Sequence, residues 1–254
     1  MISRFLSSRP GQALKEPLRK SFERTGYDVV PLRRDDTLRL GALLDAHGVA
    51  SVIDVGANQG QYARRMRLMG FAGHIVSVEP GAAAFRLLAQ RAAGDANWTV
   101  WQVALGGVDG TASLRVSRNS VSSSLLDVAE THLSAAPESK THHLEAISVR
   151  RLDDVARAIS GPLWLKVDTQ GYELEVLAGG KETLARTAIL QLELSLTSLY
   201  TGQPDYLEVL RRVNEDFRVV DVIPGFRSPV SGDLLQVDVL AVRSIPKTPR
   251  ALAQ

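Results

Sequence analysis

Four acidic residues stand where short apolar runs of this sequence end. They are Asp54, Glu79, Asp168 and Glu193, in the runs "SVIDV", "HIVSVEP", "LWLKVD" and "AILQLEL". Runs of this length, rich in aliphatic residues, are typical of strands that are buried on both faces of a sheet. Ligands of an open α/β sheet bind beyond the carboxyl ends of its strands. The sequence therefore predicts that these acids lie at one rim of a sheet, where they can act on a ligand.

The segment that follows the first run, "DVGANQG", predicts a ligand-binding turn. Gly56 and Gly60 let the backbone turn tightly and approach a ligand. The helix expected after them offers free N–H groups at its start. Asn58 occupies the second glycine position of the dinucleotide pattern G-x-G-x-x-G, so the match fails at the residue that makes room for a pyrophosphate.

The charge of Asp54 favours a particular ligand for this turn. A carboxylate repels phosphates and attracts a cationic amino group. S-adenosylmethionine carries such an amino group and a sulfonium but no phosphate, and its carboxylate can bind at a helix N-terminus. Glu79, 19 positions after Gly60, can accept both ribose hydroxyls, although NAD shares that ribose. Two alternatives without a ligand stay open: Asp54 caps a helix or a turn, and Glu79 is a solvated residue at the end of a strand. We assign the cofactor site to Asp54, Gly56, Ala57, Asn58, Gly60, Tyr62, Glu79 and Ala104.

Asp168 and Glu193 are the candidates for catalysis, because adjacent parallel strands end side by side. The pair could hold a divalent cation such as Mg²⁺, which would polarise a hydroxyl. Alternatively, one carboxylate acts as the general base while the other orients the acceptor, or the two form a hydrogen-bonded pair without any such role. His142 and His143 are rival bases, since histidine titrates near neutral pH. Lys166 either pairs with an acid or faces the sheet edge.

Alternating strands and helices predict an α/β fold with a doubly wound, mainly parallel sheet. The last two strands are joined by a Pro/Gly loop without a helix, which predicts one antiparallel strand. The expected strands are 51–55, 74–80, 98–105, 163–168, 188–194, 217–223 and 234–242, and the expected helices are 61–70, 82–93, 172–186 and 204–216.

The chain organisation predicts one main domain, residues 41–245, between an N-terminal extension (1–40) and a C-terminal tail (246–254). An inserted loop or hairpin around 106–150 interrupts the alternation. Its centre, 118–145, is rich in Ser, Thr and His, and a long irregular insertion is usually functional or disordered. We expect Ser122 and Ser123 to line a binding pocket or else to be solvated.

Composition limits the class of protein. The 254 residues include 30 Lys and Arg against 28 Asp and Glu, so a net charge of +2 gives no broad field for nucleic acid despite a pI near 9.0. With no cysteine, disulfides and thiolate metal sites are excluded. No apolar run reaches the roughly 18 residues of a transmembrane helix, and the N-terminus lacks a signal-peptide core. We expect a cytoplasmic protein with a small-molecule partner and no nucleic acid, and leave a homodimer open.

Five blocks, in order, resemble the FkbM-type methyltransferases. They are "SVIDVGANQGQYA", "VSVEP", "RRLDDV", "LWLKVDTQGYELEVLAGG" and "LQLELS", and the resemblance spans roughly residues 40–242. It implies S-adenosylmethionine-dependent methylation of a hydroxyl, often on a sugar, glycolipid or secondary metabolite. It also implies the seven-stranded methyltransferase variant of the Rossmann fold.

Two other functions stay open. One is an NAD(P)-dependent oxidoreductase, disfavoured by Asn58, by Asp54 and by the lack of a Tyr-x-x-x-Lys pair. The other is a non-catalytic module that binds adenosylmethionine.

Overall fold

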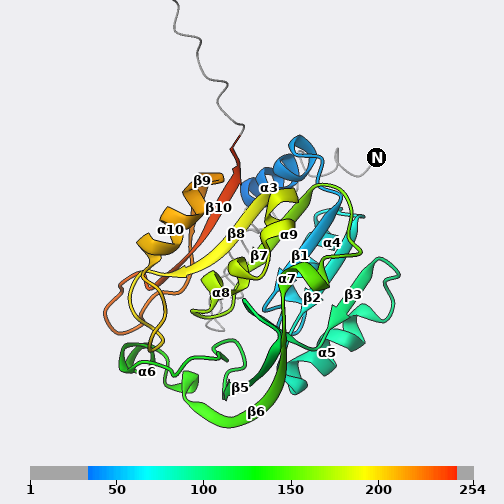
Figure 1. Ribbon diagram of the computed structural model, residues 1–254. Coiled ribbons are helices and arrows are strands. Elements are labelled where there is room, and N and C mark those ends of the chain that lie inside the picture. Colours follow the sequence, from blue (N-terminus) through cyan, green and yellow to red (C-terminus); the bar gives the residue numbers. More distant parts are fainter. Residues whose placement is uncertain (1–33, 245–254) are drawn as a thin grey trace, which may run out of the picture. The chain divides into compact units, whose positions relative to one another are not determined.

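A computed structural model describes residues 34–244 of the chain (Figure 1). Most of the expected N-terminal extension and the whole expected C-terminal tail lie outside the described residues. The chain divides into two compact units, Met1–Leu43 and Leu44–Gln254, and the second contains every site discussed below. Helix α3 (Arg34–Ala46) precedes the first strand in the chain. Within the described range, no helix has both the length and the apolar character needed to cross a membrane.

The main sheet has seven strands in the order β3-β2-β1-β7-β8-β10-β9. β10 pairs antiparallel with both of its neighbours, and the remaining pairs are parallel. This confirms the predicted doubly wound sheet with one antiparallel strand. The chain moves outward from β1 through β2 and β3, then returns to the other side of β1 as β7, so the ligand crevice is expected between β1 and β7. The strands are β1 (Ser51–Val55), β2 (His74–Val78), β3 (Trp98–Trp101), β7 (Leu163–Val167), β8 (Thr187–Ser195), β9 (Phe217–Pro224) and β10 (Gln236–Arg243).

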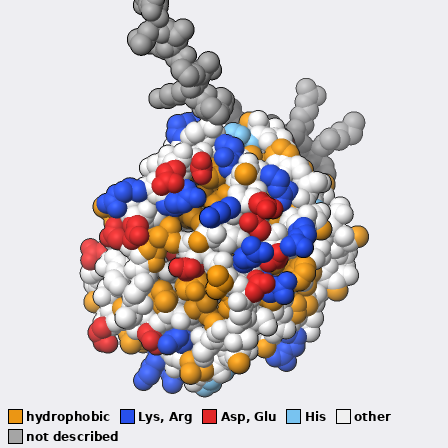
Figure 2. Space-filling view, viewed as in Figure 1, with side chains coloured by type: hydrophobic (Ala, Val, Ile, Leu, Met, Phe, Trp, Pro, Cys, Tyr) orange, Lys and Arg blue, Asp and Glu red, His pale blue; other side chains and the backbone are white. Residues whose placement is uncertain are grey.

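The face of the molecule shown in Figure 2 carries charges of both signs. Blue and red side chains lie interspersed there around apolar side chains near the centre of the view. Mixed charges of this kind give no single-sign field over that face.

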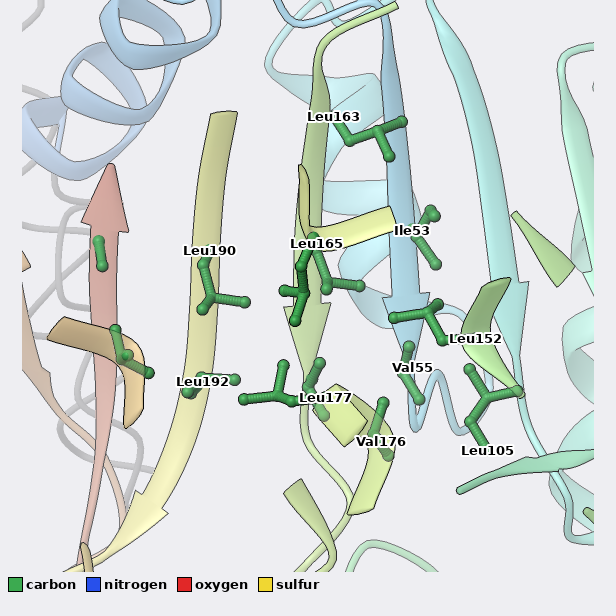
Figure 3. Close-up of a cluster of buried hydrophobic side chains, with 14 of the residues drawn as sticks. Ile53, Val55, Leu105, Leu152, Leu163, Leu165, Val176, Leu177, Leu190 and Leu192 are labelled. Atoms are coloured by element: carbon green, nitrogen blue, oxygen red, sulfur yellow. The ribbon is translucent and has the colours of Figure 1, made fainter. Parts of the chain in front are cut away.

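One side of the sheet is covered by an aliphatic core. Ile53 of β1, Leu165 of β7 and Leu192 of β8 point to the same side and are almost fully buried (Figure 3). Val176 and Leu177 of α8 pack against them in the same cluster. Burial of each such side chain stabilises the folded protein by about 1.5–3 kcal/mol, so this aliphatic face holds the helices packed against the sheet. The helices of the second unit are α4 (Gln61–Leu68), α5 (Ala82–Ala92), α6 (Glu130–Ala135), α7 (Leu152–Val155), α8 (Glu173–Ala178), α9 (Lys181–Arg186) and α10 (Tyr206–Asn214).

The opposite side of the sheet carries a row of buried polar residues. Asp54 is in register with Lys166, and Lys166 is in register with Gln191. Because successive side chains of a strand alternate, these three point away from the aliphatic core. Tyr62 of α4 reaches this row, and its hydroxyl donates a hydrogen bond to Oε1 of Gln191 at 2.8 Å. The sheet itself therefore places charged groups beneath the expected ligand crevice.

A second, three-stranded sheet has the order β4-β6-β5. It consists of β4 (Ala104–Leu105), β5 (Gly110–Ser117) and β6 (Thr141–Arg150), with α6 and a 3₁₀ turn, Pro137–Ser139, between the last two strands. In Figure 1, β5, β6 and α6 lie at the end of the main sheet toward which β1, β7 and β8 run. The inserted segment thus lies beside the carboxyl ends of the parallel strands.

The predicted strand 98–105 is wrong as a single element. The structure divides it into β3, at the edge of the main sheet, and β4, which pairs in parallel with β6. An apolar run shows that a strand forms but not which partner supplies its hydrogen bonds. Here that partner is 45 residues further along the chain, at Val149 opposite Ala104.

The predicted helix 172–186 is also divided, into α8 and α9, at Gly179 and Gly180. A Cβ atom on Gly179 would lie 2.1 Å from the carbonyl oxygen of Gly106, and one on Gly180 would lie 2.5 Å from Leu152. Gly179 is therefore a point of close backbone approach, and Gly180 lies against the Leu152 side chain, at the place where one helix ends and the next starts.

Candidate active site

The turn after β1 depends on close approach and on left-handed backbone. A Cβ atom on Gly56 would lie 1.8 Å from the carbonyl oxygen of Asp168, so only glycine lets this turn pass the end of β7. Asn58 has a φ of 47°, in the left-handed region. Asparagine is one of the few residues that adopt this region readily. Asn58 thus supplies the conformation that a glycine would, and this explains the departure from the dinucleotide pattern.

Glu79 is held in place by the backbone at the end of β2. Its Oε2 accepts a hydrogen bond from the N–H of Asn58, and its Oε1 accepts one from the N–H of Gly81, each at 2.8 Å. The residue is 8% exposed, and burial raises the pKa of its carboxyl to about 7. A carboxyl fixed in this way is oriented before any ligand arrives.

A first cavity of about 360 Å³ opens at the carboxyl ends of β1, β2 and β7. Apolar side chains such as Val78, Leu105 and Leu114 form part of its wall, and Lys166 and Asp168 form part of its polar side. Of the residues predicted to bind the cofactor, six line this cavity: Gly56, Ala57, Asn58, Tyr62, Glu79 and Ala104. Asp54 and Gly60 do not.

Asp54 has an internal counter-ion. It is fully buried, and its Oδ1 lies 3.3 Å from the ammonium of Lys166, while its Oδ2 has no hydrogen-bond partner within the described residues. Burial raises the pKa of Asp54, against the opposing effect of Lys166. The sequence predicted that Asp54 faces a cationic amino group of the ligand. The cation that the structure places beside it is Lys166.

Lys166 joins two acids beneath the first cavity. Its ammonium lies 3.2 Å from Oδ2 of Asp168 and 5.2 Å from the centre of the Tyr62 ring. The side chain is 10% exposed, and the charges of Asp168 and Asp54 outweigh burial and raise its pKa. Asp54, Lys166 and Asp168 therefore form a buried ion-pair triad that runs from the sheet to the cavity.

Gln170 holds Asp168 and Glu193 together. Its amide nitrogen donates to Oδ1 of Asp168 at 2.8 Å and to Oε2 of Glu193 at 2.5 Å. Its amide oxygen accepts from the Tyr200 hydroxyl at 2.8 Å. The amide of Gln236 also donates to Oε2 of Glu193, at 2.9 Å. Burial, followed by the charge of Asp168, raises the pKa of Glu193 well above its usual range.

The predicted carboxylate pair is thus brought together, but its surroundings do not fit a divalent cation. Gln170 and Lys166 each occupy one oxygen of Asp168, and an ammonium 3.2 Å away would repel a metal ion. Across residues 34–244, no three His, Cys, Asp or Glu side chains are arranged to hold one. The expected Mg²⁺ is therefore not supported by this donor set.

A second cavity, of about 340 Å³, adjoins the carboxylate pair. Ten of the described residues line it, from the insertion and from the ends of strands and the loops beside them: Asn119, Val121, Ser122, His132, Ala136, Asp168, Gln170, Glu193, Phe226 and Gln236. Three of these, Val121, Asp168 and Gln170, also line the first cavity. Of the two serines considered in the sequence, Ser123 lines the first cavity and Ser122 lines the second. The two cavities thus share a wall at Asp168.

His142 and His143 lie on β6 and line neither cavity. Both are exposed, and Nε2 of His143 lies 3.0 Å from Oε1 of Glu145. The histidine that lines the second cavity is His132, on α6, which the sequence analysis did not select. No spacing rule could have distinguished it, because α6 belongs to the irregular insertion.

Three further residues of the network were missed in the sequence: Gln170, Tyr200 and Gln236. Gln170 sits between Asp168 and Gly171 in "DTQG", and its φ of 56° cannot be read from that string. A non-glycine residue in this conformation is typical of functional sites, where local strain is tolerated.

Comparisons with known proteins agree with these features. The family model described as the methyltransferase FkbM domain matches residues 54–219. The chain is 26% identical over 199 residues to the 2-O-methyltransferase NoeI of Sinorhizobium fredii (strain NBRC 101917 / NGR234). The matched region covers 72% of this chain and 77% of that protein.

Two solved structures are similar at a lower level. An rRNA methylase from Streptococcus thermophilus has a TM-score of 0.46 at 10% identity and covers 85% of this chain and 100% of that one. Fibrillarin from Aeropyrum pernix, with natively bound S-adenosyl-L-methionine, has a TM-score of 0.40 at 11% identity and covers 82% and 73%. Likeness this weak bears on no functional assignment.

The doubly wound sheet, with its ligand crevice between β1 and β7, defines a Rossmann-like α/β protein. The family match makes the class specific: the chain belongs to the FkbM methyltransferase family, whose members depend on S-adenosylmethionine. This confirms the resemblance seen in the sequence and sets aside the oxidoreductase alternative.

Proposed function

We propose that this protein is an O-methyltransferase that transfers the methyl group of S-adenosylmethionine to a hydroxyl of a small molecule, such as a sugar, a glycolipid or a secondary metabolite. The observation that carries the proposal is the wall shared by the two cavities. Asp168 and Gln170 line both, so a group bound in one cavity meets a group bound in the other at a carboxylate. The name of the similar 2-O-methyltransferase supports transfer to oxygen.

The first cavity fits the methyl donor. The Glu79 carboxylate is already oriented by two backbone N–H groups, as an acceptor for two ribose hydroxyls should be. Gly56 leaves open the space that a Cβ would fill, and the apolar wall suits an adenine ring. When bound, the donor supplies an electrophilic methyl group on its sulfonium. Asp54 acts on this site indirectly, because its ion pair with Lys166 fixes the position of that ammonium group.

Asp168 is the candidate general base. An alcohol is a weak nucleophile until its proton is removed, and we assign the removal of that proton to the Asp168 carboxylate. Gln170 and Lys166 each hold one of its oxygens, so its orientation is set before reaction. Alignment of this kind accounts for a large part of many enzymatic rate enhancements. Glu193, bonded to the same amide of Gln170, orients Asp168 and the acceptor.

The test combines a variant with a transfer assay. Purified protein and radiolabelled S-adenosylmethionine are incubated with a panel of sugars, glycosides, glycolipids and phenols, and donor binding is measured by calorimetry. Asp168→Asn should lower kcat by about 10²–10⁴-fold, as loss of a general base does, and should change the donor Kd less than threefold.

Two outcomes would contradict the proposal. Full activity of the Asp168→Asn variant would exclude Asp168 as the base. Tight donor binding with no transfer to any member of the panel would instead favour the non-catalytic binding module.

A further inference from the structure

The second cavity has an unusual charge composition for a binding site. Among residues 34–244, none of the ten that line it is Lys or Arg, whereas two of them, Asp168 and Glu193, carry carboxyl groups. The nearby ammonium of Lys166 is engaged by Asp54 and Asp168. A phosphate or carboxylate bound here would lie beside Asp168, and the described part of the lining offers no cation to offset the repulsion.

Two side chains with rings, His132 and Phe226, line this cavity. The His132 ring stacks edge-on against Tyr200, at 5.2 Å between ring centres, and lies 6.0 Å from Phe226. His132 is 3% exposed, and burial lowers the pKa of its imidazole, so the ring is uncharged at neutral pH. Within the described residues, the Nδ1 atom of His132 has no hydrogen-bond partner. The Leu199 backbone favours the charged form of the ring, but this effect on the pKa is smaller than that of burial. The histidine therefore adds no positive charge to the cavity.

The polar side of the cavity suits hydroxyl groups. Oε2 of Glu193 accepts from the amides of both Gln170 and Gln236. Asn119, which also lines the cavity, donates to the Ser122 hydroxyl at 3.0 Å. Amides, hydroxyls and carboxyls can each exchange hydrogen bonds with an alcohol. A volume of about 340 Å³ is at the lower end of ligand sites, which corresponds to a small molecule or to the terminal unit of a larger one.

We propose that the second cavity is the acceptor site, and that it selects an uncharged hydroxyl compound over one that carries a phosphate or a carboxylate. The proposal rests on the methyltransferase function above and adds to it the place and the charge class of the acceptor. In this site His132 and Phe226 contact the apolar side of the acceptor, and its reacting hydroxyl lies at the shared wall beside Asp168.

A single introduced thiol provides the first test, because the chain has no cysteine. Ala136→Cys places a thiol in the lining of the second cavity. Ser134→Cys places one two residues earlier, in the last turn of α6, at an exposed residue outside both cavities, and serves as the matched control. The rate of labelling by benzyl methanethiosulfonate is followed with methyl glucoside or glucose 6-phosphate present at equal concentration.

Methyl glucoside should slow labelling of Ala136→Cys at least threefold, glucose 6-phosphate should not, and neither should affect Ser134→Cys. Equal or stronger protection by the phosphorylated compound overturns the proposed charge class. Lack of protection by either compound overturns the assignment of the site.

Methyl transfer provides the second test, with the acceptors found in the panel. Benzyl-labelled Ala136→Cys should transfer at least tenfold more slowly than the same variant unlabelled, with a donor Kd unchanged within twofold. Transfer within twofold of the unlabelled protein overturns the proposal. If the wild-type protein fails to bind the donor or transfers to no acceptor, that result counts against the methyltransferase function instead. Failure of the acceptor-site proposal and failure of the proposed function are therefore distinguishable.

Discussion

Glu79 illustrates how a buried side chain and a ligand can depend on the same proton. Burial raises the pKa of its carboxyl to about 7, whereas accepting two ribose hydroxyls requires the ionised form. Below pH 7 the carboxyl is mostly protonated, so the proposed contact with the ribose requires donor binding to release that proton.

The expected result is a donor affinity that rises with pH through the neutral range. Each pH unit below 7 should weaken binding by up to about tenfold, because one proton must be released. Calorimetry with S-adenosylmethionine at pH 5.5, 6.5, 7.5 and 8.5 measures this. Glu79→Gln should bind more weakly at pH 8.5 and show a flatter profile, and an unchanged slope in that variant would contradict the assignment.

Gln170 combines an unfavourable backbone conformation with a central hydrogen-bonding position. Its φ of 56° costs on the order of 1 kcal/mol, which a glycine would not incur. Gln170→Gly should therefore relieve local strain while removing the amide that holds Asp168 and Glu193.

We expect kcat of Gln170→Gly to fall at least tenfold, with the donor Kd changed less than threefold. Steady-state kinetics and calorimetry provide these measurements, and thermal unfolding checks that the variant folds. Wild-type kcat would show that Asp168 needs no amide to orient it.

At the scale of elements, the glycine pair between α8 and α9 decides where a helix must break. Gly179→Ala would place a methyl group 2.1 Å from the carbonyl oxygen of Gly106, which directly follows β4, while Gly179 directly follows α8. We expect a loss of about 1–3 kcal/mol in the free energy of unfolding, as overpacking usually produces.

Gly94→Ala is the matched control, because a Cβ there meets nothing within 4 Å. This substitution should leave the free energy of unfolding unchanged or raise it by up to about 1 kcal/mol, because alanine lowers the conformational entropy of the unfolded chain. Urea unfolding of both variants measures the difference. Equal stabilities would show that the close contact relaxes without cost.

The same elements show what could be predicted along the chain. The β1 turn, Glu79 and the Asp168 strand were located correctly because strand ends and glycine turns leave local signals. The division of 98–105 between two sheets and the break at Gly179 depend on contacts with distant segments. His132 and Gln236 enter the second cavity from irregular or distant parts of the chain, which have no periodicity to read.

At the scale of the whole molecule, several buried acids share one effect on stability. Burial raises the pKa values of Asp54, Glu79, Glu173, Glu193 and Asp238. An acid with a raised pKa in the folded state keeps a proton that the unfolded chain releases, so its contribution to stability is lost as pH rises.

The protein without ligand should therefore be less stable at pH 8 than at pH 5.5. Glu79 alone, with a pKa raised from 4.5 to about 7, should account for on the order of 2–3 kcal/mol between those limits. The raised pKa of Lys166 has no effect in this window, since lysine is charged throughout in both states. Denaturant unfolding across the range tests this, and Glu79→Gln should lose part of the slope. The lowered pKa of His132 acts in the opposite direction, since burial disfavours its charged form as the pH falls. A slope that is unchanged in Glu79→Gln would show that Glu79 is ionised in the folded protein across this range.

Cytoplasmic location, a homodimer and the boundaries of the main domain stay predictions from the sequence.

The sequence by itself determined the fold class, the glycine turn after β1 and the family, because these depend on short local patterns: strand-length apolar runs, a glycine turn and acids at strand ends. Only the tertiary structure decided which charge faces Asp54, which amide joins Asp168 to Glu193 and which histidine lines the second cavity. Those contacts join residues far apart in the chain, such as Lys166 and Asp54 across neighbouring strands. Their pairing is set by register and by the packing of the insertion, which no local pattern encodes.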